Sequence, residues 1–307
     1  MPSGRQGSIH LFKFAGVDVF LHWSWFLFAL IEVKMRVGTY SSIGWNVAEY
    51  LALFLIVLLH EYGHALACRQ VGGFANRIVL WPLGGVAYVD PPPRPGAVLW
   101  SIAAGPLVNV ALVPVLLAFS RTLREVAPTS NLHELVKAAF IINAILLIFN
   151  ILPIYPLDGG QILRALLWFF MGRARSLLVA TVVGFLGVAG MLVLAVRDSS
   201  IWYMVLSGFI LLNCWGGMKH AVMLLRAAKV PRHQGFACPW CKAAPPVGAF
   251  WRCGQCKTPL DTFEAHAVCP SCSARFDVTR CLDCGRRFPM NEWVRPAPAT
   301  PPVPDLA

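Results

Sequence analysis

Six long apolar stretches constrain the fold of this chain more than any other feature of its sequence. They occupy residues 17–31, 47–67, 97–119, 138–154, 177–196 and 201–218. Most approach the roughly 20 apolar residues that an α-helix needs to cross a bilayer. The first stretch contains Asp18 and His22 and has no AxA cleavage site, so we interpret it as a retained span and not as a signal peptide.

Composition agrees with a membrane environment. Apolar residues make up 57% of the chain and charged residues 13%, whereas about 25% of the residues in an ordinary soluble domain are charged. We therefore predict an all-α polytopic membrane protein with about six transmembrane helices.

The positions of lysine and arginine predict the orientation of the spans, because these residues accumulate on the cytoplasmic side of a membrane. With six spans, both termini share one side, and that side holds twelve of these residues against six on the other. We expect an integral multi-pass protein of the cell membrane with both termini cytosolic. The same asymmetry explains the net charge of +11 without a nucleic-acid-binding surface.

Ten cysteines occur in the chain, and eight of them form four CxxC pairs near its C-terminal end. The pairs are Cys238 and Cys241, Cys253 and Cys256, Cys269 and Cys272, and Cys281 and Cys284. A cytosolic compartment keeps thiols reduced, so this pattern indicates metal binding and not disulfides. We predict two structural zinc sites in a double zinc ribbon. The spacing favours sequential pairing of the CxxC motifs and leaves a crossed arrangement open.

These features predict four regions. The membrane domain covers residues 1–218, a basic juxtamembrane linker 219–236, the double zinc ribbon 237–294 and a disordered proline-rich tail 295–307. We expect the ribbon to bind a cytosolic protein partner. The alternative, nucleic-acid contact through Arg275, Arg286 and Arg287, is less favoured because the basic excess of the module is small.

The second apolar stretch ends in LLHEYGHALA, which contains an HExxH motif. His60 and His64 are four residues apart and therefore share one helical face, with Glu61 beside them. Two imidazoles at this spacing can hold zinc, while the glutamate accepts a proton from a water whose pKa the metal lowers to about 7. Ionisable residues at membrane depth are costly, which favours a functional site over two packed histidines.

A catalytic zinc needs a third protein ligand. Asp158 in NILPIYPLDGG is the best candidate, since it follows the fourth stretch in a segment broken by prolines. The second and fourth stretches end on the same side of the membrane, so Asp158 and His64 can meet. A plain turn aspartate is the alternative.

The motifs HEYGH, GPLVN and NILPIYPLDGG resemble the signature of the site-2 protease family of intramembrane metalloproteases, over approximately residues 9–218. The resemblance implies that His60, His64 and Asp158 hold the catalytic zinc and that Glu61 is the catalytic base. It also implies that Asn109 stabilises an oxyanion or holds substrate, and that Asn150 orients the substrate or Asp158. Helix packing is the alternative role of Asn109.

The segment IVLWPLGGVAYVD alternates apolar residues around a turn and predicts a membrane-associated hairpin. Its residues Pro82, Leu83, Gly84 and Gly85 are candidates for binding an unwound substrate by backbone pairing, and a plain re-entrant hairpin is the alternative. His22 lies among aromatic residues typical of a membrane interface, so we do not include it among the zinc ligands.

The sequence therefore predicts a zinc-dependent intramembrane endopeptidase that cuts transmembrane protein substrates within the lipid bilayer, with one catalytic zinc and two structural zincs. The competing hypotheses are a non-catalytic membrane scaffold or metal transporter, and a membrane-held zinc-ribbon adaptor.

Overall fold

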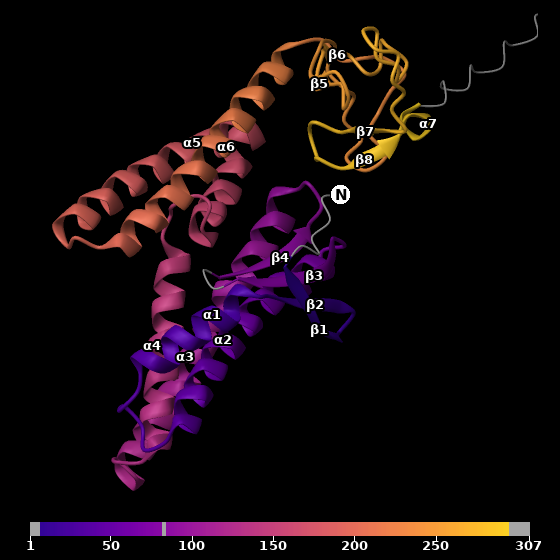
Figure 1. The fold of residues 1–307 in the computed structure, drawn as a ribbon. Coiled ribbons are helices and arrows are strands. Elements are labelled where there is room, and N and C mark those ends of the chain that lie inside the picture. The colour runs from indigo at the N-terminus through magenta and orange to yellow at the C-terminus, as the bar shows by residue number, and fades with distance from the viewer. Residues whose placement is uncertain (1–6, 82–83, 295–307) are drawn as a thin grey trace, which may run out of the picture. The chain divides into compact units, whose positions relative to one another are not determined.

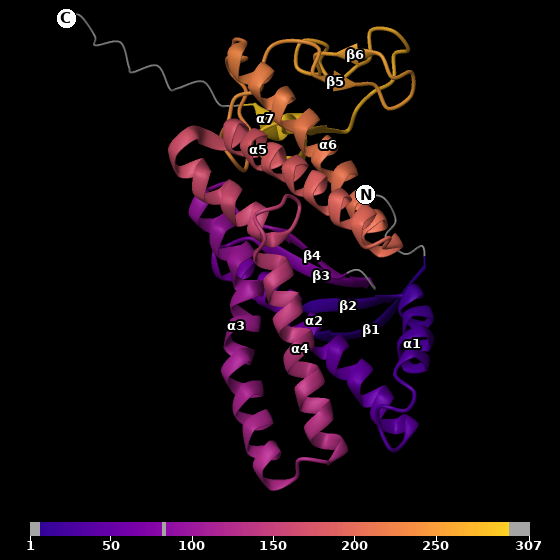
Figure 2. The same cartoon turned by 90° about the vertical axis from the view of Figure 1, so that its left-hand side faces the viewer.

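The computed structural model describes residues 7–81 and 84–294, and the chain divides into two units, Met1–Met218 and Lys219–Ala307. The first unit contains four strands and most of the helices (Figures 1 and 2). Its elements are β1 (Ser8–Phe14), β2 (Val17–His22), α1 (Ser24–Met35), α2 (Ile43–Gln70), β3 (Phe74–Trp81), β4 (Gly84–Asp90), α3 (Pro95–Val126), α4 (Asn131–Ile151), α5 (Asp158–Arg197) and α6 (Ile201–Lys229), the last of which continues into the second unit.

Five helices among the described residues, α2 to α6, are long and apolar enough to cross a membrane. The first apolar stretch, expected to form a sixth span, instead forms strand β2 and the 12-residue helix α1. The reason lies in its alternation: Val17, Val19 and Leu21 are buried while the residues between them are less buried. This period of two fits a strand with one face on the core.

The strands of the first unit form one sheet in the order β1-β2-β3-β4. β2 and β3 run parallel, and the other two pairs are antiparallel. The expected hairpin is therefore β3 and β4, joined to a larger sheet than the sequence predicted, and β4 is an edge strand. Pro82 and Leu83, which lie between β3 and β4 in the sequence, are outside the described residues.

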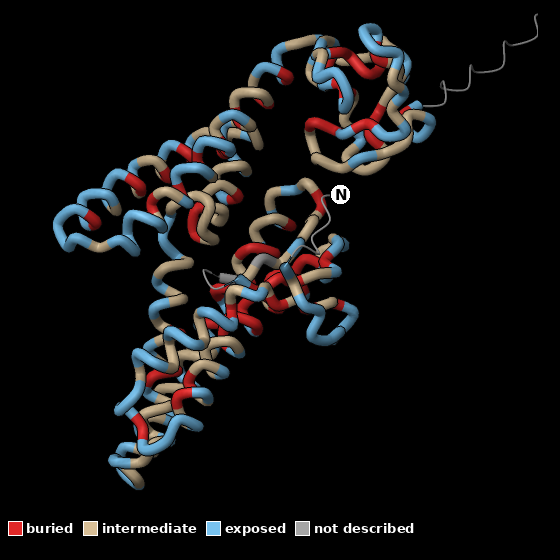
Figure 3. The backbone as a smooth tube through the Cα atoms, viewed as in Figure 1, coloured by how far each residue is buried: buried red, intermediate tan, exposed pale blue. Residues whose placement is uncertain are grey.

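The main core of the first unit lies where α2 meets the sheet. Val57, Leu58 and Tyr62 of α2 pack with the buried residues of β2 and β3, among them Ile78 and Leu80. Figure 3 shows buried residues concentrated where α2 meets the strands, whereas much of the outer surface of the helices is exposed. Many of the exposed residues on these helices are large and apolar, among them Leu55, Phe119 and Leu186, as expected of helices that cross a bilayer.

α5 is two helical segments joined at Gly172, whose φ of +78° is in the left-handed region that glycine adopts readily. Beyond the kink, α5 packs closely on α6. A Cβ atom on Gly184 would lie 2.5 Å from the sulfur of Cys214, so this approach needs a residue without a side chain. Val188, Ile210 and Cys214 form the core of the contact.

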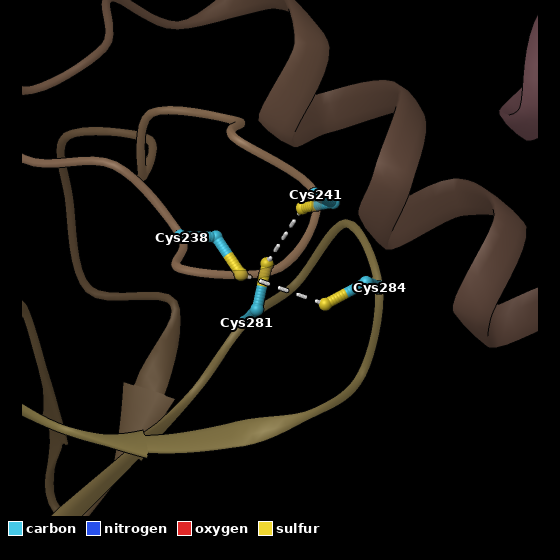
Figure 4. A group of neighbouring side chains, drawn as sticks. All are labelled: Cys238, Cys241, Cys281 and Cys284. Carbon is cyan, nitrogen blue, oxygen red and sulfur yellow. Dashed lines mark hydrogen bonds between the residues drawn. The ribbon is translucent and has the colours of Figure 1, made fainter. Parts of the chain in front are cut away.

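The second unit holds short strands around cysteine clusters: β5 (Trp251–Arg252) pairs with β6 (Pro259–Leu260), and β7 (Val278–Arg280) with β8 (Arg287–Pro289), followed by α7 (Met290–Trp293). The eight cysteines form two groups of four. One group is Cys238, Cys241, Cys281 and Cys284 (Figure 4), and the other is Cys253, Cys256, Cys269 and Cys272.

The expected sequential pairing of the CxxC motifs is therefore wrong, because the first motif joins the last and the two inner motifs join each other. The cause is contact between the two ends of the module. Phe236 and Val294 form a β-bridge, and the N–H of Ala237 donates to the carbonyl of Trp293 at 2.8 Å. This contact brings the outer motifs together.

Sulfur separations in both groups suit a four-cysteine zinc site. The closest sulfur pairs are 3.6 to 3.7 Å apart. Tetrahedral coordination with Zn–S bonds of about 2.3 Å places sulfurs about 3.8 Å apart, whereas a disulfide needs about 2.05 Å.

Candidate active site

His60 and His64 lie one turn apart near the C-terminal end of α2, and Asp158 is the first residue of α5. The structure brings their side chains together. Oδ2 of Asp158 is 3.1 Å from Nε2 of His60 and 3.2 Å from Nε2 of His64, and the two Nε2 atoms are 3.1 Å apart. These three atoms, which could each bind a metal ion, come from two helices and form a nearly equilateral triangle.

Hydrogen bonds at the opposite ring nitrogens decide what this triangle can bind. Nδ1 of His64 is 2.9 Å from the carbonyl of Ser101, and Nδ1 of His60 is 2.5 Å from Oδ1 of Asn109. Both partners are acceptors, so each Nδ1 carries a proton, and in a neutral ring Nε2 then presents a lone pair. Two such lone pairs and a carboxylate oxygen converging at this distance repel one another unless a cation lies between them.

Zinc fits this arrangement. Ligand atoms about 2.0 to 2.1 Å from a tetrahedral zinc lie about 3.3 Å from each other, which matches the three observed separations. The site also depends on a glycine. A Cβ atom on Gly105 of α3 would lie 2.2 Å from Nε2 of His64 and 2.9 Å from Nε2 of His60. Any side chain at this position would displace the ligands.

Glu61 lies beside the triangle and is held by the edge strand of the sheet. Its side chain is 5% exposed, and its Oε2 accepts a hydrogen bond from the N–H of Ala87 in β4 at 2.8 Å. Gly85, two residues earlier on the same strand, leaves room for the carboxylate, since a Cβ there would lie 2.5 Å from Oε1 of Glu61. The carboxylate is thus held between the triangle and β4, the edge strand of the sheet.

A cavity of about 680 Å³ opens onto these residues. Its walls include the triangle, Glu61 and residues of β4, α4, α5 and α6. The lining residues from β4 are Gly85, Ala87 and Val89. The helices α4, α5 and α6 contribute the polar side chains of Asn150, Gln161 and Asn213, respectively. Four of these positions, Ala87, Val89, Gln161 and Asn213, were not among the site residues expected from the sequence.

Asn109 is fully buried and lies behind His60. Its Oδ1 faces Nδ1 of His60, and its Nδ2 donates to Oδ1 of Asn143 at 2.7 Å. Both amide atoms therefore have protein partners in this structure, and a role of Asn109 toward an oxyanion or a substrate stays a prediction. Asn143 was missed at the sequence level, although a fully buried amide within an apolar helix is a recognisable signal of function.

His22 lies apart from the metal ligands. Its ring stacks on Trp81 with centroids 4.0 Å apart, and its Nδ1 is 2.5 Å from the hydroxyl of Ser24. These contacts account for the residue at the end of β2.

Two histidines one turn apart, a carboxylate from a second helix and an adjacent glutamate, all among helices that can span a bilayer, define the site of a membrane-embedded metallopeptidase. The model of peptidase family M50 matches residues 48–126 and 121–194. The solved structure of a site-2 protease from Methanocaldococcus jannaschii is similar with a TM-score of 0.50 and 30% sequence identity, covering 69% of this chain and 95% of that one. The chain belongs to family M50, the family of the site-2 proteases.

Curated relatives agree with this assignment. A zinc metalloprotease of Methanocaldococcus jannaschii is 36% identical over 177 residues, which are 58% of this chain and 50% of the relative. Stage IV sporulation protein FB of Bacillus subtilis is 35% identical over 124 residues, which are 38% of this chain and 40% of the relative. This chain spans about half the length of the curated relatives it matches. The resemblance inferred from the three motifs is confirmed.

Proposed function

We propose that this protein is a zinc-dependent endopeptidase that hydrolyses peptide bonds in or near transmembrane segments of other proteins. The observation that carries the proposal is the convergence of His60, His64 and Asp158 beside Glu61, at the wall of a cavity among membrane-spanning helices. Family membership supports a peptidase over a scaffold or a metal transporter.

His60, His64 and Asp158 would hold the catalytic zinc through the three atoms that form the triangle. When bound there, zinc would polarise the scissile carbonyl and lower the pKa of a water to about 7. Glu61 would accept the proton of the attacking water and then deliver it to the departing amine. The N–H of Ala87 supports this role, because it fixes one carboxylate oxygen and leaves the other for the proton.

The edge of β4 is the proposed binding site for the substrate backbone. The N–H of Ala87 points away from β3, since it bonds to Glu61, and alternation along a strand turns Gly85 and Val89 the same way. All three line the cavity. A substrate segment unwound from its helix could pair with this edge and pass its carbonyls over the metal ligands. We propose that Asn150, which lines the cavity, and Gly84 of β4 bind the same backbone. The expected contributions of Pro82 and Leu83 lie outside the described residues.

We propose three zincs for each chain, one at the histidine and aspartate site and one in each group of four cysteines. The two cysteine sites would be structural, because four thiolates leave no open position for water. We expect residues 237–294 to recruit a cytosolic protein partner and not nucleic acid.

Both termini are proposed to face the cytosol, with the protein in the cell membrane. α1 has only 12 residues. The sheet nevertheless supports the proposal that both termini lie on the same side of the membrane. β2 pairs in parallel with β3, which follows the C-terminal end of α2, so the N-terminal strands lie at that end of α2. Four further spans, α3 to α6, return the chain to the same side. The excess of lysine and arginine on that side supports the cytosol.

The test is cleavage of a fluorescent single-span protein in proteoliposomes. Wild type should cut it, and Glu61→Gln should retain the metal but lose cleavage, since glutamine cannot carry the proton. Glu134→Gln, the same chemical change at an exposed position of α4 whose partner is Lys137, is the control and should cleave as wild type does. Normal cleavage by Glu61→Gln would remove Glu61 as the base.

A further inference from the structure

Three hydrogen bonds connect the metal-binding end of α2 to α4 through α3. Nδ1 of His60 lies 2.5 Å from Oδ1 of Asn109, Nδ2 of Asn109 donates to Oδ1 of Asn143 at 2.7 Å, and Nδ2 of Asn143 donates to the backbone carbonyl of Asn109 at 3.0 Å. Both asparagines are 0% exposed. The chain of bonds therefore operates without solvent.

The direction of this chain is fixed at its far end. A backbone carbonyl can only accept, so the amide nitrogen of Asn143 must face the carbonyl of Asn109. The oxygen of Asn143 then faces Asn109, and only the nitrogen of the Asn109 amide can donate to it. This leaves the oxygen of Asn109 toward His60, where it accepts the Nδ1 proton and leaves Nε2 as a lone pair.

The opposite orientation of Asn109 would remove His60 as a metal ligand. A flipped amide would present its N–H to Nδ1, which would then have to accept, and the ring proton would move to Nε2. That nitrogen lies 3.1 Å from Oδ2 of Asp158, so it would donate to the carboxylate. Nε2 of His60 and Oδ2 of Asp158 would then be hydrogen-bonded to each other, and Nε2 would have no lone pair for a metal ion.

We propose that Asn143 is a positioning residue that selects the metal-binding tautomer of His60 by holding the amide of Asn109 in one orientation. The inference rests on the proposed zinc site. Partners that orient metal ligands typically contribute about 10- to 100-fold in metal affinity, and Asn143 contributes through one intervening amide. α4, which supplies none of the zinc ligands, thus controls the site through a single side chain.

The experiment measures zinc affinity of the full-length protein in detergent by competition with a fluorescent chelator, after the two cysteine-bound zincs are counted. Asn143→Leu keeps similar volume and removes both hydrogen bonds. The double variant Asn109→Asp, Asn143→Leu restores an acceptor for His60, because both carboxylate oxygens accept and the orientation of the group no longer matters. Thr181→Val removes another buried hydroxyl, bonded to Leu178 in α5, and controls for lost buried hydrogen bonds.

Asn143→Leu should weaken the third zinc about 10- to 100-fold while the two cysteine zincs stay bound. The double variant should recover most of this loss, and Thr181→Val should bind zinc as wild type does. Wild-type affinity in Asn143→Leu, or a loss that the double variant does not recover, would overturn the inference. A wild-type protein with only two zincs would instead overturn the proposed zinc site itself, and the inference with it.

Discussion

Replacing Gly105 with alanine should disable the metal site, because the added methyl group crowds the two histidines. The added Cβ would lie 2.2 Å from Nε2 of His64 and 2.9 Å from Nε2 of His60. An ordinary contact needs about 3.4 Å, so His64 must move by about 1.2 Å. A misplacement of about 1 Å can cost about 10²-fold in rate, which equals about 2.7 kcal/mol.

The free energy of unfolding should also fall, because crowding a packed core typically costs about 1–3 kcal/mol, whereas alanine favours a helix interior over glycine by only about 0.5–1 kcal/mol. The assay combines cleavage of a single-span substrate in proteoliposomes, zinc content and thermal unfolding. Gly190→Ala is the matched control, since a Cβ there meets nothing within 4 Å. Wild-type zinc content and cleavage in Gly105→Ala would refute the close approach of α3 to the ligands.

Two further predictions concern the cysteine module. The first CxxC motif shares a group with the last. Elemental analysis should therefore show that the double variant Cys238→Ser, Cys284→Ser loses one zinc and that Cys238→Ser, Cys253→Ser loses two. The reverse result would indicate sequential pairing of the motifs. Burial opposes ionisation of Asp261, but hydrogen bonds from Gly248, His233 and the following backbone outweigh it and lower the pKa of Asp261 below 3.8. An aspartate whose pKa is lower in the folded state than in the unfolded state stabilises the fold above pH 3.8. This stabilisation is lost as the pH falls through the pKa of the folded state. Asp261→Asn should therefore lower the free energy of unfolding of the module by about 1–3 kcal/mol at pH 7. Chemical denaturation should show that the difference in this free energy between wild type and the variant becomes smaller below about pH 4. An equal difference at pH 7 and below pH 4 would contradict this prediction.

The parts of the fold that follow from local pattern were predictable from the sequence. The four-residue spacing of His60 and His64 places both on one helical face, and the polarity of successive spans brings Asp158 to the same end. The prediction that the first apolar stretch crosses the membrane was wrong, although the sequence contains a pattern that indicates a strand. Val17, Val19 and Leu21 alternate with Asp18, Phe20 and His22, a strand pattern that total hydrophobicity conceals.

Contacts between distant segments could not be predicted in this way. The nested cysteine pairing depends on the bridge between Phe236 and Val294, whereas the CxxC spacing is compatible with either pairing. The role of Asn109 depends on which neighbours its amide meets. Motif resemblance identified the residue, but only the position of Asn143 on α4 shows that both amide atoms are already bonded.

The central claim is that zinc is bound by His60, His64 and Asp158. The most direct test is an anomalous difference map collected at the zinc absorption edge from crystals of the full-length protein. We predict three peaks, one among these three side chains and one within each group of four cysteines. The cysteine peaks serve as an internal standard for occupancy. Two strong cysteine peaks with no density among His60, His64 and Asp158 would contradict the account.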